Sequence, residues 1–315
     1  MTPVSTAALY QSALFNIENN ENNVAKYTDQ AGSGFVSQNL AGYGDQAGQL
    51  TALNSTNAKL TSYVNGAQSL SNQLDAQNTA LTQVNTAAQA AVTAINQAVG
   101  QNSATTLLST LQAQLTNAAS ALNTQYNGQY LFSGGNVNTA PVANSTLSNL
   151  NTTADVTAAF TNGSAISSTQ LGGNTTVPTG QLASSVGQPL FSALQQIQAY
   201  NAGPNGPLTG SLTQAQSTFL QGVVSQFSSA LQTTTNAVAS NGVVQAQVST
   251  IQTNLGDQQT ALQGVISNVT DVDPAKVSTQ LTLAQSALQL SAQVFEGLQS
   301  SSLLNLLSPT TTSAA

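Results

Sequence analysis

The side chains that most often carry out chemistry are nearly absent from this chain. Its 315 residues include no histidine, no cysteine and no arginine, and the only cations are Lys26, Lys59 and Lys276. Without histidine or cysteine the chain cannot form a Ser-His-Asp triad, a Cys-His dyad or an ordinary zinc site. General acid–base catalysis would depend on ten carboxylates that are scattered along the whole sequence.

Two pairs of acidic residues that are close together in the sequence are the best candidates for a catalytic arrangement. Glu18 and Glu21 form one pair, and Asp271 and Asp273 form the other. The Glu pair suits a solvated helix face. Asp273 precedes Pro274, and this order is typical of a helix N-cap followed by proline in the first turn. We therefore predict that the chain is not an enzyme, with no catalytic residue, no cofactor and no metal.

Charge and hydropathy exclude further classes of protein. A net charge of −7 with 4% charged residues argues against nucleic-acid binding, which depends on Lys and Arg. No segment has the ~18 consecutive apolar residues of a membrane span. The N-terminus lacks the basic start of a secretory signal peptide. The absence of cysteine suits a protein that is exported unfolded or works outside the cell, although a cysteine-poor proteome would explain it equally.

The strongest periodic signal runs from Leu50 to Val99. Alternate steps of three and four residues from Leu50 reach mostly apolar positions, and every seventh residue from Leu53 to Ile95 is apolar. This heptad pattern, uninterrupted by proline, predicts one very long helix. The other series, every seventh residue from Leu50, includes the polar residues Asn57, Ser71, Asn78 and Asn85. These side chains are either buried, where they would fix the register of the packed helices, or solvated.

Further helices and a non-helical segment follow. A second apolar stripe begins at Leu108 and ends at Tyr126-Asn127-Gly128, which we interpret as a helix stop before a short strand, 129–132. Residues 136–187 are rich in Asn, Thr, Ser and Gly, which indicates a β- or loop-rich insert that is disordered in part or folded. Helical patterns return at Pro189 and continue to the C-terminus, with breaks at 201–207 and 271–274.

These patterns predict a mainly α protein, an elongated antiparallel helical rod with coiled-coil terminal helices and a small β/loop-rich insert at the far tip. The expected organisation is an N-terminal assembly helix (1–45), rod helices (46–135), a variable outer insert (136–187), rod helices (188–270) and a C-terminal assembly helix (271–315). The residues expected in the rod seam are Leu53, Leu60, Leu74, Leu81, Ile95, Leu255 and Leu262.

The two terminal segments are amphipathic but nearly uncharged. Burying Gln, Asn or Ser against a partner costs less than burying Lys or Glu, so such helices suit packing between subunits. Closure of a monomeric bundle is the alternative. The residues expected at subunit contacts are Leu14, Ile17, Val24, Leu281, Leu288, Phe295, Leu298 and Leu303.

Three stretches of the sequence carry distinctive motifs. The first runs from Gly32 to Ala47 and includes Asp45. The second is Asn-Gly-Gln-Tyr-Leu-Phe-Ser-Gly-Gly at 127–135, with the motif residues Tyr130, Leu131 and Phe132. The third begins at 271 with Asp-Val-Asp-Pro-Ala, which contains Asp273, and closes at Ser302-Leu303-Leu304. Together they resemble the bacterial flagellin family, and within it most closely the hook-associated proteins of the hook–filament junction, although the family usually has two aspartates where this chain has Asp45.

The resemblance implies a structural subunit that is exported unfolded by the flagellar type III pathway. It further implies extracellular location in the flagellum, a role in motility, an export chaperone, and assembly with identical or homologous axial subunits and a hook-associated protein. The junction position is favoured by the aromatic 130–132 motif and the small insert. A filament flagellin is the nearest alternative, and a secreted adhesin or surface-layer protein with a ligand-binding or glycosylated insert is a more distant one.

Overall fold

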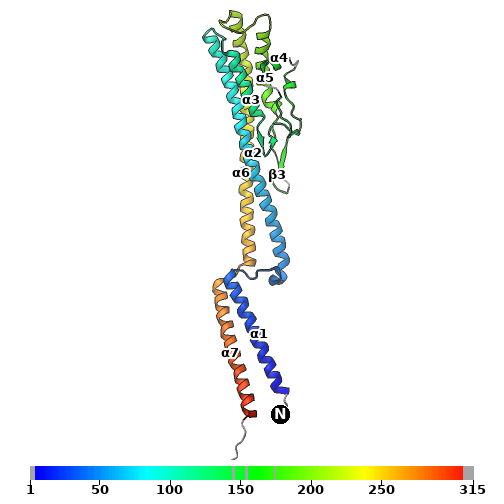
Figure 1. The fold of residues 1–315 in the computed structure, drawn as a ribbon, viewed down its shortest axis with the longest axis vertical. Coiled ribbons are helices and arrows are strands. Elements are labelled where there is room, and N and C mark those ends of the chain that lie inside the picture. The colour runs from blue at the N-terminus through cyan, green and yellow to red at the C-terminus, as the bar shows by residue number, and fades with distance from the viewer. Residues whose placement is uncertain (1–3, 144–145, 153–154, 174, 308–315) are drawn as a thin grey trace, which may run out of the picture. The chain divides into compact units, whose positions relative to one another are not determined.

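The computed structural model describes residues 4–143, 146–152, 155–173 and 175–307, with side chains described between Ala8 and Ser300. The chain divides into two compact units (Figure 1). The terminal unit contains the residues up to Lys59 and those from Gln259, and the central unit contains Leu60–Gln258. Helices dominate both units, so the predicted mainly α class is confirmed.

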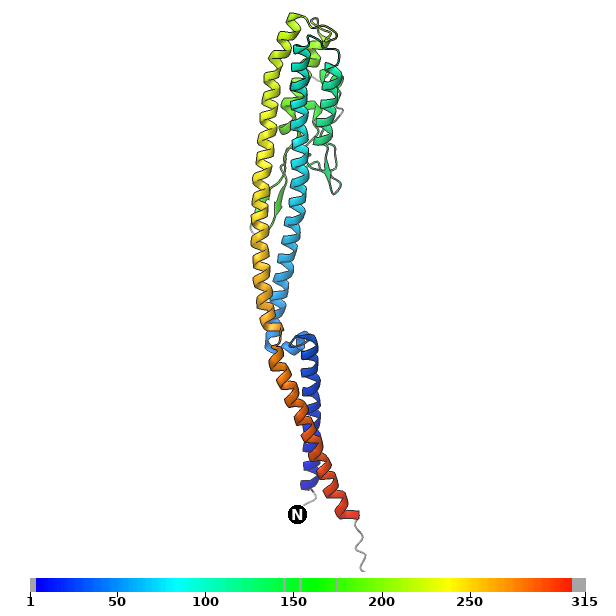
Figure 2. The same ribbon diagram turned by 90° about the vertical axis from the view of Figure 1, so that its left-hand side faces the viewer.

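The terminal unit is an antiparallel helix pair. It consists of α1 (Val4–Ser33) and α7 (Pro274–Leu307), with the 3₁₀ helix η1 (Leu40–Gln46) and the adjoining ends of α2 (Ala47–Gly100) and α6 (Gln214–Thr270). Figures 1 and 2 show α1 and α7 side by side along their length. Residues early in α1 meet residues late in α7, as the Tyr10 hydroxyl shows by donating to the Leu298 carbonyl at 2.9 Å.

The start of α7 has the cap that the sequence predicts. The Asp273 carboxylate accepts hydrogen bonds from the backbone N–H groups of Ala275 (2.9 Å) and Lys276 (3.3 Å). These two groups have no partner within the first turn of a helix, so the carboxylate satisfies them. Pro274 occupies the first helical position, where its missing N–H costs nothing.

The central unit is built on α2 and α6, which run antiparallel. The Asn85 amide donates to the Thr234 hydroxyl at 2.8 Å, and the Asn241 amide donates to the Leu74 carbonyl at 2.9 Å. Two shorter helices, α3 (Leu107–Leu122) and α5 (Ala183–Ala202), pack against this pair (Figure 2). The α5 helix begins before Pro189, the residue at which the sequence pattern placed its start.

The seam of α2 matches one of the two predicted heptad series. Ala67, Leu74, Leu81, Ala88 and Ile95 are buried, whereas Leu53 and Leu60 near the start of the helix are half-buried. The sequence prediction placed the other heptad series one residue too far toward the C-terminus. The buried positions are Leu70, Gln77, Val84, Ala91 and Ala98, and the predicted Ser71, Asn78 and Asn85 are half-buried beside them. On α6, Leu255 is buried and Leu262 is half-buried.

The insert does not form the tip of the α2–α6 pair, so that expectation is wrong. The end of the pair at Gly100 is closed by two loops, where Ala104 N–H donates to the Gly210 carbonyl at 2.7 Å. The insert instead lies along the helices (Figure 1). Leu171 and Val177 from the insert are buried in a cluster with residues in the middle of the two long helices, Ala67, Leu70, Leu74 and Val248.

The insert contains short elements only. They are α4 (Leu147–Thr152), the 3₁₀ helix η2 (Val156–Ala159), and the antiparallel strands β3 (Ser168–Gln170) and β4 (Thr176–Pro178). Its buried apolar residues pack against the core formed by α2, α3, α5 and α6. They are Leu147, Leu150, Val156 and Ala159. The described part of the insert is therefore folded onto the helices.

The Asn127-Gly128 pair is a hairpin turn and not a helix stop. The α3 helix ends at Leu122, and two short strands follow, β1 (Gln125–Tyr126) and β2 (Gln129–Tyr130). Both turn residues have positive φ, 50° for Asn127 and 78° for Gly128. This geometry is the preferred two-residue hairpin turn, for which Asn-Gly is the favoured sequence.

Candidate functional site

The α1–α7 pair is held by specific contacts along its length. The Tyr10 ring packs edge-on against the Phe295 ring, with 5.9 Å between centroids. Further along, the Asn20 amide donates to the Ser291 hydroxyl at 2.9 Å. These contacts combine apolar burial with uncharged hydrogen bonds, so the pair forms without an ion pair between any described residues.

Most of the predicted assembly residues lie half-buried in this pair. The half-buried members are Ile17, Val24, Leu281, Leu288, Phe295 and Leu298. Leu14 is 53% exposed, and Leu303 lies on α7 beyond the described side chains. The heptad stripe thus identifies the residues that close the pair inside one chain, and their contact with other subunits stays a prediction.

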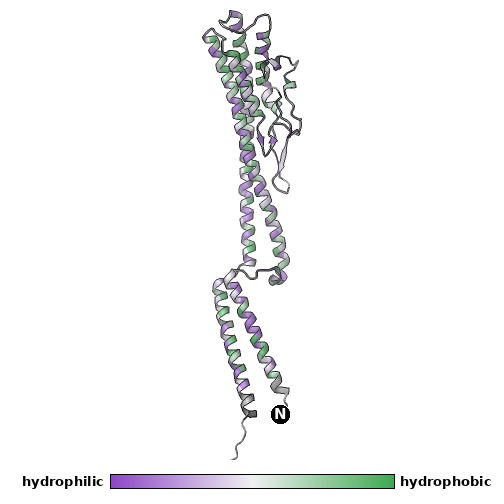
Figure 3. Cartoon of the chain, viewed as in Figure 1, coloured by the Kyte–Doolittle hydropathy of each residue, from purple (hydrophilic) through white to green (hydrophobic). Residues whose placement is uncertain are grey.

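A second set of apolar residues on the pair is exposed. Phe15 is 64% exposed and Leu290 is 62% exposed. Among the described side chains of the two helices, the exposed large apolar residues are Leu9, Leu14, Phe15, Leu283, Leu290 and Val294. Hydrophobic residues recur along both helices in Figure 3. All six lie in stretches without charge, since α1 has none before Glu18 and α7 has none between Lys276 and Glu296. Apart from Leu14, the sequence interpretation missed these residues because they fall outside the main apolar stripe.

The connection from α1 to α2 is ordered by backbone and side-chain hydrogen bonds. Val36 N–H donates to the Thr270 carbonyl at 2.7 Å, and Val272 N–H donates to the Gly34 carbonyl at 3.0 Å. The Tyr43 hydroxyl donates to the Ser37 carbonyl at 2.7 Å. The motif residue Asp45 lies exposed in η1. These bonds fix the segment beside the junction of α6 and α7.

The motif at 127–135 fastens the insert to the helices. Phe132 is fully buried, and Leu131 is buried beside it in the core formed by α2, α3, α5 and α6. The Phe132 carbonyl accepts from Ala183 N–H at 2.9 Å, at the start of α5. The Leu131 N–H donates to the Thr124 carbonyl at 3.0 Å, which closes the hairpin. Tyr130 is half-buried on the outer side of this core.

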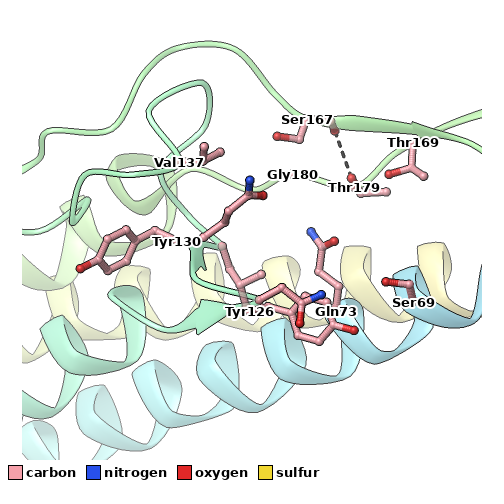
Figure 4. Close-up of a pocket in the computed structure, with 12 residues that line it drawn as sticks. Ser69, Gln73, Tyr126, Tyr130, Val137, Ser167, Thr169, Thr179 and Gly180 are labelled. Carbon is pink, nitrogen blue, oxygen red and sulfur yellow. Dashed lines mark hydrogen bonds between the residues drawn. The ribbon is translucent and has the colours of Figure 1, made fainter. Parts of the chain in front are cut away.

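A pocket of about 340 Å³ lies beside the hairpin. Its wall is formed by α2, the hairpin and the strands of the insert, and Figure 4 shows Gln73 rising from α2 toward the segment of Ser167 and Thr179. The lining includes Tyr126 and Tyr130 and contains no charged residue. Hydroxyl and amide groups without a neighbouring base or acid do not make a nucleophile or a proton-transfer pair.

A local hydrogen bond shifts the pKa of one carboxyl in the insert. Among the groups described, the pKa of Asp155 is lowered, first by the hydrogen bond from the Thr157 N–H (2.9 Å) at the start of η2. Asp155 is exposed and acts as an N-cap. The described residues include no group of three potential metal ligands, and none of their helices has the length and hydropathy of a membrane span.

Comparison of the sequence with family models decides the identity. Residues 4–137 match the bacterial flagellin N-terminal helical region, and residues 224–307 match the flagellin C-terminal helical region. The chain belongs to the bacterial flagellin family. The two matches cover α1, α2, α3 and the hairpin on one side, and most of α6 with α7 on the other. No curated protein matches the chain.

Solved structures share the fold of this flagellin-family chain. A putative flagellar hook-associated protein from Vibrio parahaemolyticus is 14% identical and superposes with a TM-score of 0.57 over 74% of this chain and 99% of its own. FlgL from Bacillus cereus is 15% identical, with a TM-score of 0.53 over 69% of this chain and 99% of its own. The putative hook-associated protein and FlgL therefore share this helical arrangement, and at these identities the likeness shows the fold.

The family confirms the central sequence prediction. The chain is a structural protein, an axial subunit of the extracellular bacterial flagellum, and not an enzyme. The three stretches that suggested the family lie inside or at the edge of the matched regions. Membership in an axial family implies assembly with other flagellar subunits.

Proposed function

We propose that this flagellin-family subunit works at the junction between hook and filament. The observation that carries the proposal is the Tyr130-Leu131-Phe132 motif, in which Leu131 and Phe132 are buried. This motif resembles the aromatic element of junction proteins more than that of filament flagellins. The small insert between the two flagellin helical regions agrees with this position. The shared fold with hook-associated proteins is consistent with it.

The proposed assembly surface is the exposed apolar set on α1 and α7. Residues such as Phe15 and Leu290 are mostly exposed in the single chain, and covering them with another subunit removes apolar area from water. The polar residues around them are uncharged Gln, Asn, Ser and Thr, which lose less hydration free energy on burial than charged residues. Apolar exposure with a low desolvation cost favours helix packing between subunits.

The proposed partners follow from this surface. They are identical or homologous axial subunits and a hook-associated protein on the adjoining level of the axial stack. We also propose an export chaperone in the cytoplasm that covers the terminal helices before export. The same apolar residues would otherwise be exposed at the concentrations at which subunits accumulate.

Location along isolated flagella tests the junction position. Antibodies against the central unit, followed by gold labelling of sheared flagella, should mark one band at the base of each filament. Quantitative mass spectrometry of the same preparation should find this chain as a minor component. A chain that labels the filament along its length and dominates its mass is a filament flagellin, and that result would overturn the junction proposal.

Point variants test the assembly surface without disturbing the α1–α7 pair. Phe15→Ser combined with Leu290→Ser should abolish incorporation into flagella, while the secreted chain keeps its helical circular dichroism spectrum. The matched control replaces exposed polar residues on the same helices, Gln11→Ser with Gln289→Ser, and should assemble normally. Normal incorporation of the Phe15→Ser/Leu290→Ser variant would exclude this surface. Deletion of 1–40 or 275–315 should leave a secreted or cytoplasmic monomer that does not assemble.

A further inference from the structure

Two amide side chains are buried in the seam between α2 and α6 with unsatisfied polar atoms. Gln77 and Asn241 are each 1% exposed. The Asn241 amide donates to the Leu74 carbonyl at 2.9 Å, but its Oδ1 has no hydrogen-bond partner among the described residues. Both Nε2 and Oε1 of Gln77 are also without a partner there. Neither flagellin membership nor the assembly surface accounts for these amides.

The two side chains lean into the same layer of the seam. Side chains on a helix tilt toward its N-terminus, so Gln77 leans toward the turn that contains Leu74. Asn241 already reaches that turn from α6 through its hydrogen bond to the Leu74 carbonyl. Since the two helices are antiparallel, Asn241 in turn leans toward the part of α6 that faces Gln77. We call this arrangement the amide layer.

The amide layer separates two apolar clusters. On one side, α2 contributes its buried residues from Ala80 to Ala98 to a cluster shared with α3, α5 and the first part of α6. We call this the four-helix cluster. On the other side lies a smaller group, made of Ala67, Leu70, Leu74, Leu171, Val177 and Val248. We call it the hairpin cluster, after the β3–β4 strand pair of the insert, which contributes to it. Gln77 on α2 and Asn241 on α6 occupy the seam positions between them.

Buried amide atoms without partners weaken the seam at this point. An unpaired polar group in the interior costs free energy that water would restore if the helices separated there. Local opening of the hairpin cluster exposes the amide layer to water and so recovers this cost. The four-helix cluster is the larger of the two and is held by α2, α3, α5 and α6, so opening it would expose more apolar surface. Proteins open locally in cooperative segments when one part is bound less tightly than its neighbour.

We propose that the Gln77–Asn241 amide layer divides the central unit into two cooperative units. The α2 and α6 segments around the hairpin cluster open on their own while the four-helix cluster remains folded. The amide layer thus marks the boundary between two cooperative segments of the α2–α6 pair. With a continuous apolar seam at this position, the pair would instead unfold as a single cooperative unit.

Amide hydrogen exchange of the full-length monomeric chain tests this division. In the natural sequence, amides of residues 66–74 and 244–255 should exchange at least tenfold faster than those of 84–95 and 220–230. Gln77→Leu combined with Asn241→Leu fills the layer with apolar side chains and should slow exchange of the first group at least tenfold. Exchange of the second group should change less than twofold.

The matched control makes the same chemical changes at exposed positions of the same helices. Gln83→Leu with Asn236→Leu should leave both groups of amides unchanged. A second variant, Gln77→Met, keeps the side chain unbranched and should slow exchange of the first group at least threefold even if the double Leu variant misfolds. Uniform exchange along α2 in the natural sequence, or no slowing in Gln77→Met, would overturn the proposal.

Discussion

Tyr10 and Phe295 meet edge-on across the α1–α7 pair, with 5.9 Å between their ring centroids and an interplanar angle of 88°. The same Tyr10 hydroxyl donates to the Leu298 carbonyl at 2.9 Å, one turn further along α7. One side chain therefore supplies both an apolar contact and a hydrogen bond near the chain termini. Because the exposed apolar residues lie on these same two helices, the closed pair is the scaffold that presents them.

Tyr10→Phe should loosen the terminal pair without removing its aromatic contact. The change deletes the hydrogen bond to the Leu298 carbonyl and keeps the ring against Phe295. The expected loss is about 1 kcal/mol, which corresponds to about fivefold faster amide exchange in the facing parts of α1 and α7. Tyr27→Phe is the control, because the Tyr27 hydroxyl lies on the same helix without a hydrogen bond to another described residue. Equal exchange in Tyr10→Phe and the natural chain would contradict this role.

Asp273→Ala should weaken the start of α7. It removes the hydrogen bonds to the backbone of Ala275 and Lys276 and the negative charge near the helix N-terminus. Loss of such a cap costs about 1 kcal/mol. Thermal unfolding followed by circular dichroism and exchange of the Ala275 and Lys276 amides would measure the effect. Asp273→Asn keeps an oxygen acceptor and should behave almost like the natural chain, and an Asn variant as unstable as the Ala variant would argue against capping.

The heptad pattern of α2 was only partly readable from the sequence. The series from Leu53 to Ile95 is apolar throughout and therefore predicted the seam. The second series was ambiguous because Lys59 and Asp75 are the only charged residues in the sequence of this helix, and neighbouring Ala, Ser and Asn fit either side. In the structure α3 and α5 also pack on α2, so Ala80 and Ala87 are buried next to the seam. Partners contributed by other segments decide such a choice, and a single-helix pattern does not contain them.

The assembly residues illustrate a similar limit. Helical periodicity finds the stripe that buries most apolar area, and here that stripe closes α1 against α7 through Ile17 and Phe295. Residues such as Phe15 and Leu290 lie outside the stripe, and only the folded pair shows that they are mostly exposed. The Asp273 cap, in contrast, was predictable because it depends on local sequence alone.

Acidification should loosen the first turn of η2 through Asp155. The hydrogen bond from the Thr157 N–H lowers the pKa of the Asp155 carboxyl in the folded chain below the ordinary value of an aspartate. A lowered folded pKa means that the carboxylate stabilises this turn above the unfolded pKa and loses that contribution as pH falls through the folded pKa. The Thr157 amide resonance should therefore shift with a midpoint below the ordinary pKa of an aspartate carboxyl. Asp155→Asn should remove the titration, and a midpoint above that value would contradict the assigned cause.

Gly134→Ala should detach the insert from the helices. Gly134 has a φ of 61°, a conformation that alanine adopts only with strain. A Cβ atom there would lie 2.8 Å from the carbonyl oxygens of both Gly163 and Ala165, which are backbone atoms that have little room to move. Strain of this kind costs about 1–3 kcal/mol before the clash is added.

The neighbouring glycine provides the control for this prediction. A Cβ on Gly135 would meet the Ala165 Cβ at 3.7 Å, an ordinary contact, and its φ is not positive. Gly135→Ala should therefore melt close to the natural chain, whereas Gly134→Ala should melt several degrees lower and become sensitive to protease cleavage within residues 136–182. Protease resistance and melting equal to the natural chain in Gly134→Ala would show that the insert is not fastened through this turn. The N–H groups of Gly163 and Ala183 donate to the carbonyls of Ser133 and Phe132, which precede Gly134. Loosening the turn should therefore also speed hydrogen exchange of the Gly163 and Ala183 amides.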